Sequence, residues 1–388
     1  MIESMHTILL RAAAEAGGAL PFVRFMELAL YHPEQGYYMQ QRSRIGRSGD
    51  FVTAPEVTSL FGELLALQWF EVWELLGCPE RFDLVELGAG TGQLAVDLLT
   101  TARHIPGFAR ALHYVIVERS PDFQAVQERM LTRAGAQGQV SWQASLESLS
   151  ASLEQGLVGG ILSNEFFDAL PVHWLEMTAD GWRELGAAWT GDAWQAVTIP
   201  LTPAVDPDYF SRRGLQVTAG YRTELGLEGQ AWMQRLGKML RRGVILTIDY
   251  GYPEREYHHP HRPAGRLVGH RHHERVDDPL AFPGEMDLTA HVDFSALARM
   301  GRASGLETLG FTSQGWFLMG LGILTRLEKL LAGDKVPPAI KKQLPGAVQR
   351  LVMPDAMGER FKVLAQGTGL PPGSLLAGFR LNDQCQRL

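Results

Sequence analysis

The hydrophobic pattern of the chain is clearest at residues 82–102. A mostly apolar run at 82–87 gives way to a loop with three alternate glycines, and residues 93–102 then follow a helical period. Leu84, Val85 and Leu87 are typical of a buried parallel strand. We therefore predict a strand, a tight turn and a helix, with the turn at the carboxyl edge of an open α/β sheet, where ligands bind.

The same alternation continues along the chain. Apolar runs predict strands at 114–117, 140–142, 159–163, 244–251, 306–311 and 361–366, and helical spacing predicts helices at 122–133, 230–241, 294–303 and 316–331. Strands that alternate with helices are the signature of an α/β fold with a doubly wound sheet. The sequence therefore predicts a Rossmann-like sheet of seven strands.

The remaining segments are expected to surround this sheet. Helices are predicted at 1–18, 22–30, 60–76 and near 346–351, hairpins at 174–199, and loop structure at 252–287 and 333–345. We divide the chain into a helical cap with a covering loop (1–80), a core with hairpin and histidine-rich insertions (81–311), and a helical insertion with a closing strand (312–388).

The glycine spacing narrows the choice of ligand. Dinucleotide folds use G-x-G-x-x-G, and their last glycine lets the helix pack closely beneath a pyrophosphate. Here Gln93 occupies that position, and the pattern is G-x-G-x-G. Glu118 ends the next apolar run, 26 residues after Gly92, and a carboxylate there can accept hydrogen bonds from both ribose hydroxyls. These features favour S-adenosylmethionine (SAM), a nucleoside with an amino-acid tail and no phosphate, over a nicotinamide cofactor.

Acidic residues follow the strand predicted at 159–163. Asn164 and Glu165 come directly after it, and Asp168 lies three residues later, with Phe166 and Phe167 between the acids. Two carboxylates on one turn suit a guanidinium, which they can hold bidentately. The alternative is a helix that begins here, with Asn164 as its cap and acids in its first turn. The spacing alone leaves both interpretations open.

Histidines are frequent between residues 258 and 291. His258, His259, His261, His270, His272 and His273 have no regular ligand spacing, no cysteine lies among them, and arginines are interspersed. We expect no metal site and interpret this segment as a substrate-facing or lid loop. Asp293 is a good cap for the helix that follows, and His291 is expected to orient a loop or to face the pocket.

The composition excludes several classes of protein. The 388 residues are 45% hydrophobic and 20% charged, with a net charge of −7, which argues against a nucleic-acid-binding protein held by bulk electrostatics. Three glutamates interrupt the most apolar long segment, 60–76, so it predicts an amphipathic helix and no membrane insertion. With two cysteines and no evident secretion signal, we expect a cytoplasmic protein.

Together these motifs resemble the SAM-dependent methyltransferase family that includes the mitochondrial complex I assembly factor 7 and its bacterial relatives. The similar stretches cover most of the chain: residues 26–33 with 36–38, 49–56, 61–63, 86–92, 164–171, 248–251, and 283–284 with 287–294. The first stretch and 164–171 are specific to this family, whereas many methyltransferases share the glycine loop.

The resemblance implies a class I methyltransferase that uses SAM and modifies a protein side chain, arginine in this family. It implies that Asn164, Glu165 and Asp168 face the acceptor and that residues 49–55 close over the cofactor. The cofactor-binding residues that we predict are Gly49, Asp50, Thr53, Pro55, Glu86, Gly88, Gly90, Gly92, Glu118, Ser145 and Asn164.

The chain departs from the family pattern at one place, and other functions stay open. Family members commonly carry Gly-Thr-Leu-Arg where this chain has Gly265-Arg266-Leu267-Val268, so the acceptor is expected to differ here if that arginine contacts substrate in the family. A small-molecule O- or N-methyltransferase is the rival enzyme. The alternative outside enzymes is a SAM-binding assembly factor with little turnover. The pair Glu165 and Asp168 favours an enzyme over such a binding protein, because a protein that only binds SAM needs no carboxylates beside the sulfonium.

Overall fold

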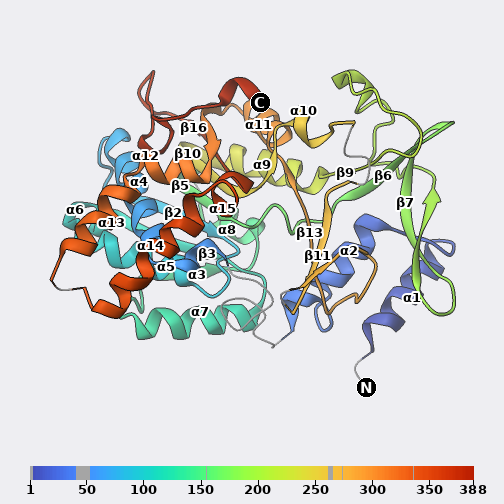
Figure 1. Ribbon diagram of the computed structural model, residues 1–388, viewed down its shortest axis with the longest axis horizontal. Helices are drawn as coiled ribbons and strands as arrows, with labels where there is room; N and C mark the ends of the chain where they lie inside the picture. The colour runs from blue at the N-terminus through green and yellow to red at the C-terminus, as the bar shows by residue number, and fades with distance from the viewer. Residues whose placement is uncertain (1–2, 41–52, 154, 261–264, 273, 335) are drawn as a thin grey trace.

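A seven-stranded sheet forms the centre of the protein (Figure 1). The computed structural model describes residues 3–40, 53–153, 155–260, 265–272, 274–334 and 336–388. The order across the sheet is β15 (Glu307–Ser313), β16 (Phe361–Thr368), β10 (Leu240–Tyr252), β5 (Leu157–Asn164), β2 (Phe82–Leu87), β3 (Leu112–Val117) and β4 (Val140–Gln143). β16 is antiparallel to both neighbours, and the other neighbouring pairs are parallel.

This order confirms the predicted doubly wound α/β sheet. From β2 the chain moves outward to β3 and β4, and it then returns to place β5 on the other side of β2. The two halves of the sheet therefore diverge at the carboxyl ends of β2 and β5, where α/β folds bind their ligands. A short strand, β14 (Val292–Asp293), pairs in parallel with the end of β10.

Helices cover both faces of the sheet, because a parallel sheet is stable only when both faces are buried. Leu84 and Val85 of β2 show this, since they are adjacent and belong to separate hydrophobic clusters on opposite faces. The cluster of Leu84 contains residues of α3 (Ala54–Val57), α4 (Leu60–Leu75), α5 (Gln93–Ala102), α6 (Pro106–Ala111) and α7 (Pro121–Arg133), and also of the three C-terminal helices described below. Those in the cluster of Val85 are α8 (Leu146–Ser152), α9 (Leu227–Met239) and α11 (Phe294–Ala303).

Two C-terminal predictions are wrong in detail. The helix expected at 316–331 is two helices, α12 (Gln314–Gly320) and α13 (Ile323–Ala332), because Gly322 adopts a left-handed φ of 84° between them. The segment expected to be irregular up to Pro345 is helical from residue 338, in α14 (Pro338–Val352). Leu344, Val348 and Leu351 bury one side of α14 in the core, and this packing outweighs the break that proline normally causes.

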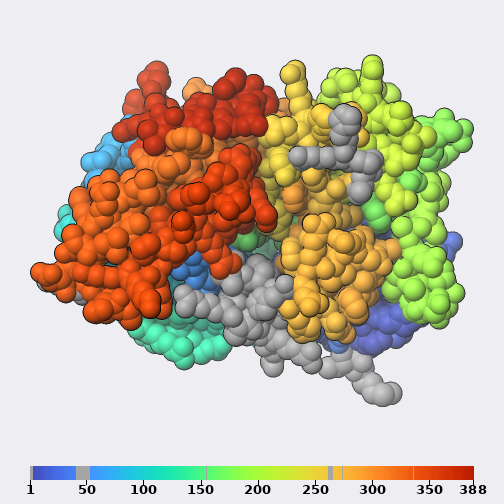
Figure 2. Space-filling model, in the orientation of Figure 1, coloured from blue at the N-terminus to red at the C-terminus, as the bar shows by residue number. Residues whose placement is uncertain are grey.

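A second sheet lies beside the first and carries the predicted hairpins. Its antiparallel order is β1 (Leu20–Pro21), β7 (Gly181–Trp189), β6 (His173–Thr178) and β9 (Arg222–Leu225), and β8 (Trp194–Ile199) also pairs with β7. The N-terminal helices α1 (Met5–Glu15) and α2 (Phe22–Tyr31) share a hydrophobic cluster with it. In Figure 2 this part and the C-terminal helices α13 and α14 form opposite ends of the molecule.

The histidine-rich segment is more ordered than predicted. Residues 252–287 were expected to be a loop, but β11 (Leu267–Arg271) and β12 (Glu274–Val276) form a third sheet with β13 (Asp287–Ala290), and α10 (Glu254–Tyr257) precedes it. Gly269 on β11 allows this pairing, because a Cβ there would lie 2.2 Å from the sulfur of Met286. The loop prediction is therefore wrong, since local composition does not reveal pairing with a strand that follows later.

Short elements complete the chain. They are α15 (Met357–Arg360) and the 3₁₀ turns η1 (Tyr37–Met39), η2 (Ser211–Arg213), η3 (Ala377–Phe379) and η4 (Cys385–Arg387). Within the described ranges, no helix has both the length and the apolar character needed to cross a membrane.

Helix α4 packs on β5 so closely that one position admits only glycine. A Cβ on Gly160 would lie 2.3 Å from a ring carbon of Trp69, which is fully buried. We expect Gly160→Ala to lower the free energy of unfolding by about 1–3 kcal/mol, because the overpacked ring must move within a dense core. Urea denaturation followed by circular dichroism measures this change.

The matched control is Gly346→Ala inside α14, where nothing lies within 4 Å of an added Cβ. It should raise the free energy of unfolding by up to about 1 kcal/mol, because alanine favours helix more than glycine does. Equal effects of the two substitutions would contradict the packing described for Trp69.

Candidate active site

A cavity of about 720 Å³ opens at the carboxyl ends of the central strands. Strands β2, β3, β4 and β5 supply its floor through residues at or just after their carboxyl ends. The residues that line it on this side are Glu86, Gly88, Ala89, Gly90, Thr91, Val117, Glu118, Arg119, Ser145, Asn164, Glu165 and Phe166. The N-terminal region, including Tyr31, Tyr38 and Glu56, and helix α9, through Trp232 and Arg235, form the walls.

The glycine loop takes the backbone conformation that its sequence requires. Gly88, Gly90 and Gly92 have φ angles of 63°, 51° and 83°, in the left-handed region that favours glycine. A Cβ on Gly88 would lie 3.1 Å from the ring of Phe166. The Thr91 hydroxyl donates a 2.6 Å hydrogen bond to the Glu56 carboxylate, which joins the loop to α3. Gly92 is not among the cavity-lining residues and faces α7 instead.

Two buried carboxylates lie along the same wall. Glu86 accepts a 2.7 Å hydrogen bond from the Tyr114 hydroxyl, and burial raises the pKa of Glu86 to about 7. Glu118 accepts hydrogen bonds from the Ser120 backbone N–H at 2.9 Å and from the Gln127 amide at 3.2 Å. Burial also raises the pKa of Glu118, and these donors oppose that shift.

The other predicted cofactor residues fall into two groups. Thr53, Pro55 and Ser145 line the cavity, and Ser145 also caps α8 by accepting the Ser148 N–H at 3.2 Å. Gly49 and Asp50 lie outside the described residues.

The segment after β5 is a turn and not the start of a helix. Glu165 has a φ of 52°, which is rare for a residue with a side chain. One carboxylate oxygen of Asp249 accepts the backbone N–H groups of residues 166, 167 and 168 at 3.2, 2.9 and 3.3 Å. Asp249 at the end of β10 therefore fixes the shape of this turn, and the alternative of a capped helix at Asn164 is wrong.

The turn places the two predicted acids differently. Glu165 lines the cavity and accepts a 3.2 Å hydrogen bond from the Asn164 amide. Asp168 is 3% exposed and is not among the cavity-lining residues. It accepts a hydrogen bond from Tyr250, while its Oδ1 atom is buried without a partner among the described residues.

These acids share one electrostatic environment. Burial, and then the negative charge of Asp168, raise the pKa of Glu165 to about 8. Burial raises the pKa of Asp168 to about 6, although the hydrogen bond from Tyr250 lowers it. The pKa of Asp249 is well above its usual range because of burial and of the two neighbouring carboxylates. A cation at this end of the cavity would therefore be strongly favoured.

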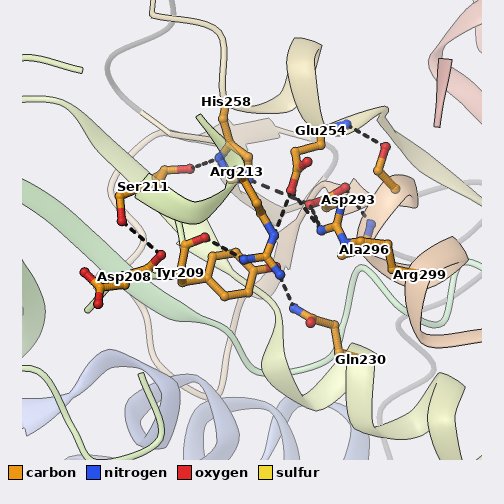
Figure 3. Close-up of polar contacts among 12 residues, drawn as sticks. Asp208, Tyr209, Ser211, Arg213, Gln230, Glu254, His258, Asp293, Ala296 and Arg299 are labelled. Atoms are coloured by element: carbon orange, nitrogen blue, oxygen red, sulfur yellow. Dashed lines mark hydrogen bonds and ion pairs between the residues drawn. The ribbon is translucent and has the colours of Figure 1, made fainter. Parts of the chain in front are cut away.

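The histidines take part in packing and ion pairing. Figure 3 shows His258 and Arg299 directed toward Asp293, at 3.8 and 4.0 Å, while Asp293 caps α11 by accepting the Ala296 N–H at 3.0 Å. The cap predicted at Asp293 is confirmed. His291 stacks on the Tyr252 ring, with 5.5 Å between ring centroids, and it is not among the residues that line the large cavity. Within the described ranges, no group of three potential metal-binding side chains occurs.

Sequence reasoning missed several residues of the site. The Tyr31 hydroxyl donates to the Ala169 carbonyl at 2.9 Å, and the Arg119 guanidinium lies 4.8 Å from the centroid of its ring. Asp249 carried a usable signal, because it is an acid within an otherwise apolar strand. Arg119 carried none, and Tyr31 carried only its place in the family-specific stretch 26–33, since only the fold brings the N-terminal helix against the end of β3.

The family model for S-adenosyl-L-methionine-dependent methyltransferases matches residues 64–312. The chain belongs to this family. The mouse protein arginine methyltransferase NDUFAF7, mitochondrial, is 31% identical over 95% of this chain and 85% of its own length. The Drosophila melanogaster homologue is also 31% identical, over 95% and 86%. A Burkholderia thailandensis protein crystallised with S-adenosyl-homocysteine is 34% identical with a TM-score of 0.89, over 99% of this chain and 96% of that chain.

The cavity of this methyltransferase fits the SAM cofactor. The glycine loop leaves room for a close approach, and we predict that the Glu118 carboxylate holds the ribose. When bound, SAM supplies an electrophilic methyl group on a positively charged sulfur. The buried acids near Glu165 favour positive charge, which is compatible with that sulfonium.

The first test of this placement is Glu118→Ala. The loss of one charged hydrogen-bonding group costs about 1.5–3 kcal/mol, so we expect SAM to bind at least about tenfold more weakly in titration calorimetry. Glu128→Ala on the exposed side of α7 is the control. Unchanged SAM affinity in a folded Glu118→Ala variant would contradict a ribose contact at this residue.

The second test uses the raised pKa of Glu165. The folded protein keeps a proton up to about pH 8, whereas the ordinary value for the unfolded chain is 4.5. Stability from this group is therefore complete below pH 4.5 and is lost as the pH rises through 8. Without cofactor, the melting temperature of Glu165→Gln should exceed that of the wild type by a margin that widens between pH 5 and 8. A margin that stays constant over this range would show that Glu165 titrates normally.

Proposed function

We propose that this methyltransferase modifies an arginine side chain of a protein. The observation that carries the proposal is the group of carboxylates at one end of the cavity, where Glu165 faces the cavity and Asp168 keeps a buried oxygen without a partner. A guanidinium has N–H donors on more than one side and can satisfy two carboxylates at once. The mouse and fly relatives, which carry the name protein arginine methyltransferase, support this proposal.

The geometry assigns different tasks to the acids. Glu165 holds the guanidinium and takes the proton that the reacting nitrogen loses when it gains the methyl group, and its raised pKa suits an acceptor of protons near neutral pH. Asp168 lies behind Glu165 and does not line the cavity, so it acts through its negative charge, which favours a cation held by Glu165. Asp249 is a positioning residue, because it acts through the backbone of residues 166–168.

Aromatic side chains surround the acids and suit a flat cation. Tyr31 and Tyr38 line the cavity, and their rings stack with 5.6 Å between centroids. Phe166 also lines it and packs edge-on against Trp232 at 4.9 Å. Aromatic faces attract guanidinium groups and exclude water, and methyl transfer requires positioning and the removal of competing water.

The other partners remain predictions. We propose a protein substrate and no nucleic-acid partner, on the support of the net charge of −7. The two cysteines, Cys78 and Cys385, are free thiols, which agrees with the reducing, cytoplasmic environment that we propose.

The acceptor is tested with Glu165→Gln and Asp168→Asn, which keep the side-chain shape and remove charge. Each should leave SAM binding nearly unchanged and reduce methyl transfer about 100-fold or more, the usual effect of losing a charge-stabilising group. The measurement is single-turnover transfer from labelled SAM to a protein extract, followed by acid hydrolysis and identification of the labelled amino acid. Asp180→Asn, on an exposed turn, is the control.

The outcomes separate the candidate functions. Label in methylarginine that disappears in both variants supports the carboxylate pair. Label confined to small molecules would indicate a small-molecule methyltransferase, in which one acid is dispensable. SAM binding without transfer to any acceptor would favour an assembly factor.

A further inference from the structure

Gln127 on α7 lies between three parts of the cofactor site. It is completely buried, although glutamine is usually exposed. Its amide nitrogen donates to the Gly90 carbonyl at 3.0 Å and to the Glu118 carboxylate at 3.2 Å. Its amide oxygen accepts the indole N–H of Trp142 on β4 at 2.9 Å. Each half of the amide therefore has a partner, and the side chain cannot rotate without losing them.

These contacts fix the orientation of the amide. The indole N–H of Trp142 is a donor only, so the oxygen of Gln127 must face β4 and the NH₂ group must face the glycine loop and Glu118. Both N–H bonds of that NH₂ group are then in use. We propose that Gln127 is a positioning residue that holds the glycine loop and the ribose-binding carboxylate in register for SAM.

The glycine loop depends on Gln127 in two ways. The bond to the Gly90 carbonyl fixes one face of the peptide that joins Gly90 to Thr91, so the Thr91 N–H points to the opposite side. The third glycine makes room for the helix, because a Cβ on Gly92 would lie 3.3 Å from both Cα and Cγ of Gln127. The last glycine of G-x-G-x-G thus serves this contact with α7.

Glu118 depends on the same side chain. Its carboxylate is 7% exposed and accepts the Ser120 N–H on Oε1, while Gln127 donates to Oε2. A buried carboxylate needs several donors to stay ionised, and two bonds to different oxygens fix the plane of the group. The remaining lone pairs of the Glu118 carboxylate then have fixed directions. A bidentate contact with two ribose hydroxyls requires such a fixed orientation.

The main test is Gln127→Met, which keeps the length and apolar volume of the side chain and removes all three hydrogen bonds. Because the Glu118 contact involves a charge, we expect the dissociation constant of SAM to rise at least about tenfold in titration calorimetry. The melting temperature of the cofactor-free protein should fall, because three groups lose a hydrogen-bond partner, whereas kcat at saturating SAM should change much less than the affinity. Glu128→Met, on the exposed side of the same helix, should match the wild type.

A second readout separates positioning from general loosening. The inference rests on the placement of the ribose at Glu118, so S-adenosylhomocysteine and its 2′-deoxy analogue are compared. Wild-type protein should bind the deoxy analogue at least about tenfold more weakly, because one hydroxyl contact with a charged group is lost. Gln127→Met should reduce this preference to about threefold or less, since Glu118 is no longer oriented.

Each outcome decides the inference. The proposed role of Gln127 would be overturned if Gln127→Met bound SAM within about threefold of the wild type. It would also be overturned if this variant bound SAM weakly but kept the wild-type preference for S-adenosylhomocysteine over the 2′-deoxy analogue. A wild type without that preference would refute the ribose placement, and with it this role, whatever the acceptor is. If Gln127→Met does not fold, Trp142→Phe takes its place, because it removes only the donor that orients the amide, and unchanged affinity and preference in that variant would overturn the role of Gln127.

Discussion

The burial of carboxylates at one edge of the sheet is the constraint on which the site depends. Strands β2, β3, β5 and β10 each end at or near an acid, and parallel strands bring these ends together. Burial raises the pKa of Glu86, Glu118, Glu165 and Asp249. An isolated buried charge is costly, so each carboxylate needs donors, and these come from Tyr114, Gln127, Asn164 and the backbone of the turn after β5. The polar residues of the site are therefore those that satisfy its acids.

The same constraint links stability to function. Acids buried close together beside the cavity weaken the fold at neutral pH, and a positively charged ligand relieves this repulsion. SAM carries such a charge, and so does a guanidinium. Without ligands, the raised pKa values of Glu165 and Asp168 allow protons to take the place of these cations. Because burying these carboxylates costs free energy, the site selects positively charged ligands.

The additions to the central sheet reach the acids at one side of the cavity. The second sheet supports α2, which brings Tyr31 to the turn after β5. The third sheet brings Asp287 within 2.6 Å of the Tyr38 hydroxyl and the Ala290 N–H within 2.9 Å of the Asp168 carbonyl. Elements far apart in the sequence therefore meet at the acids, while the ends of the central strands form the floor of the cavity.

The sequence by itself determined the central sheet, the glycine loop and the position of Glu118, because apolar periodicity and glycine spacing are local signals. It also placed Asn164, Glu165 and Asp168 at the end of a strand. Only the tertiary structure decided that Glu165 faces the cavity while Asp168 lies behind it, since Asp249, more than eighty residues away in the sequence, sets the turn between them. The third sheet and the buried amide of Gln127 were likewise not predictable. Each depends on long-range packing or pairing, which overrides local preference and leaves no periodic trace in the chain.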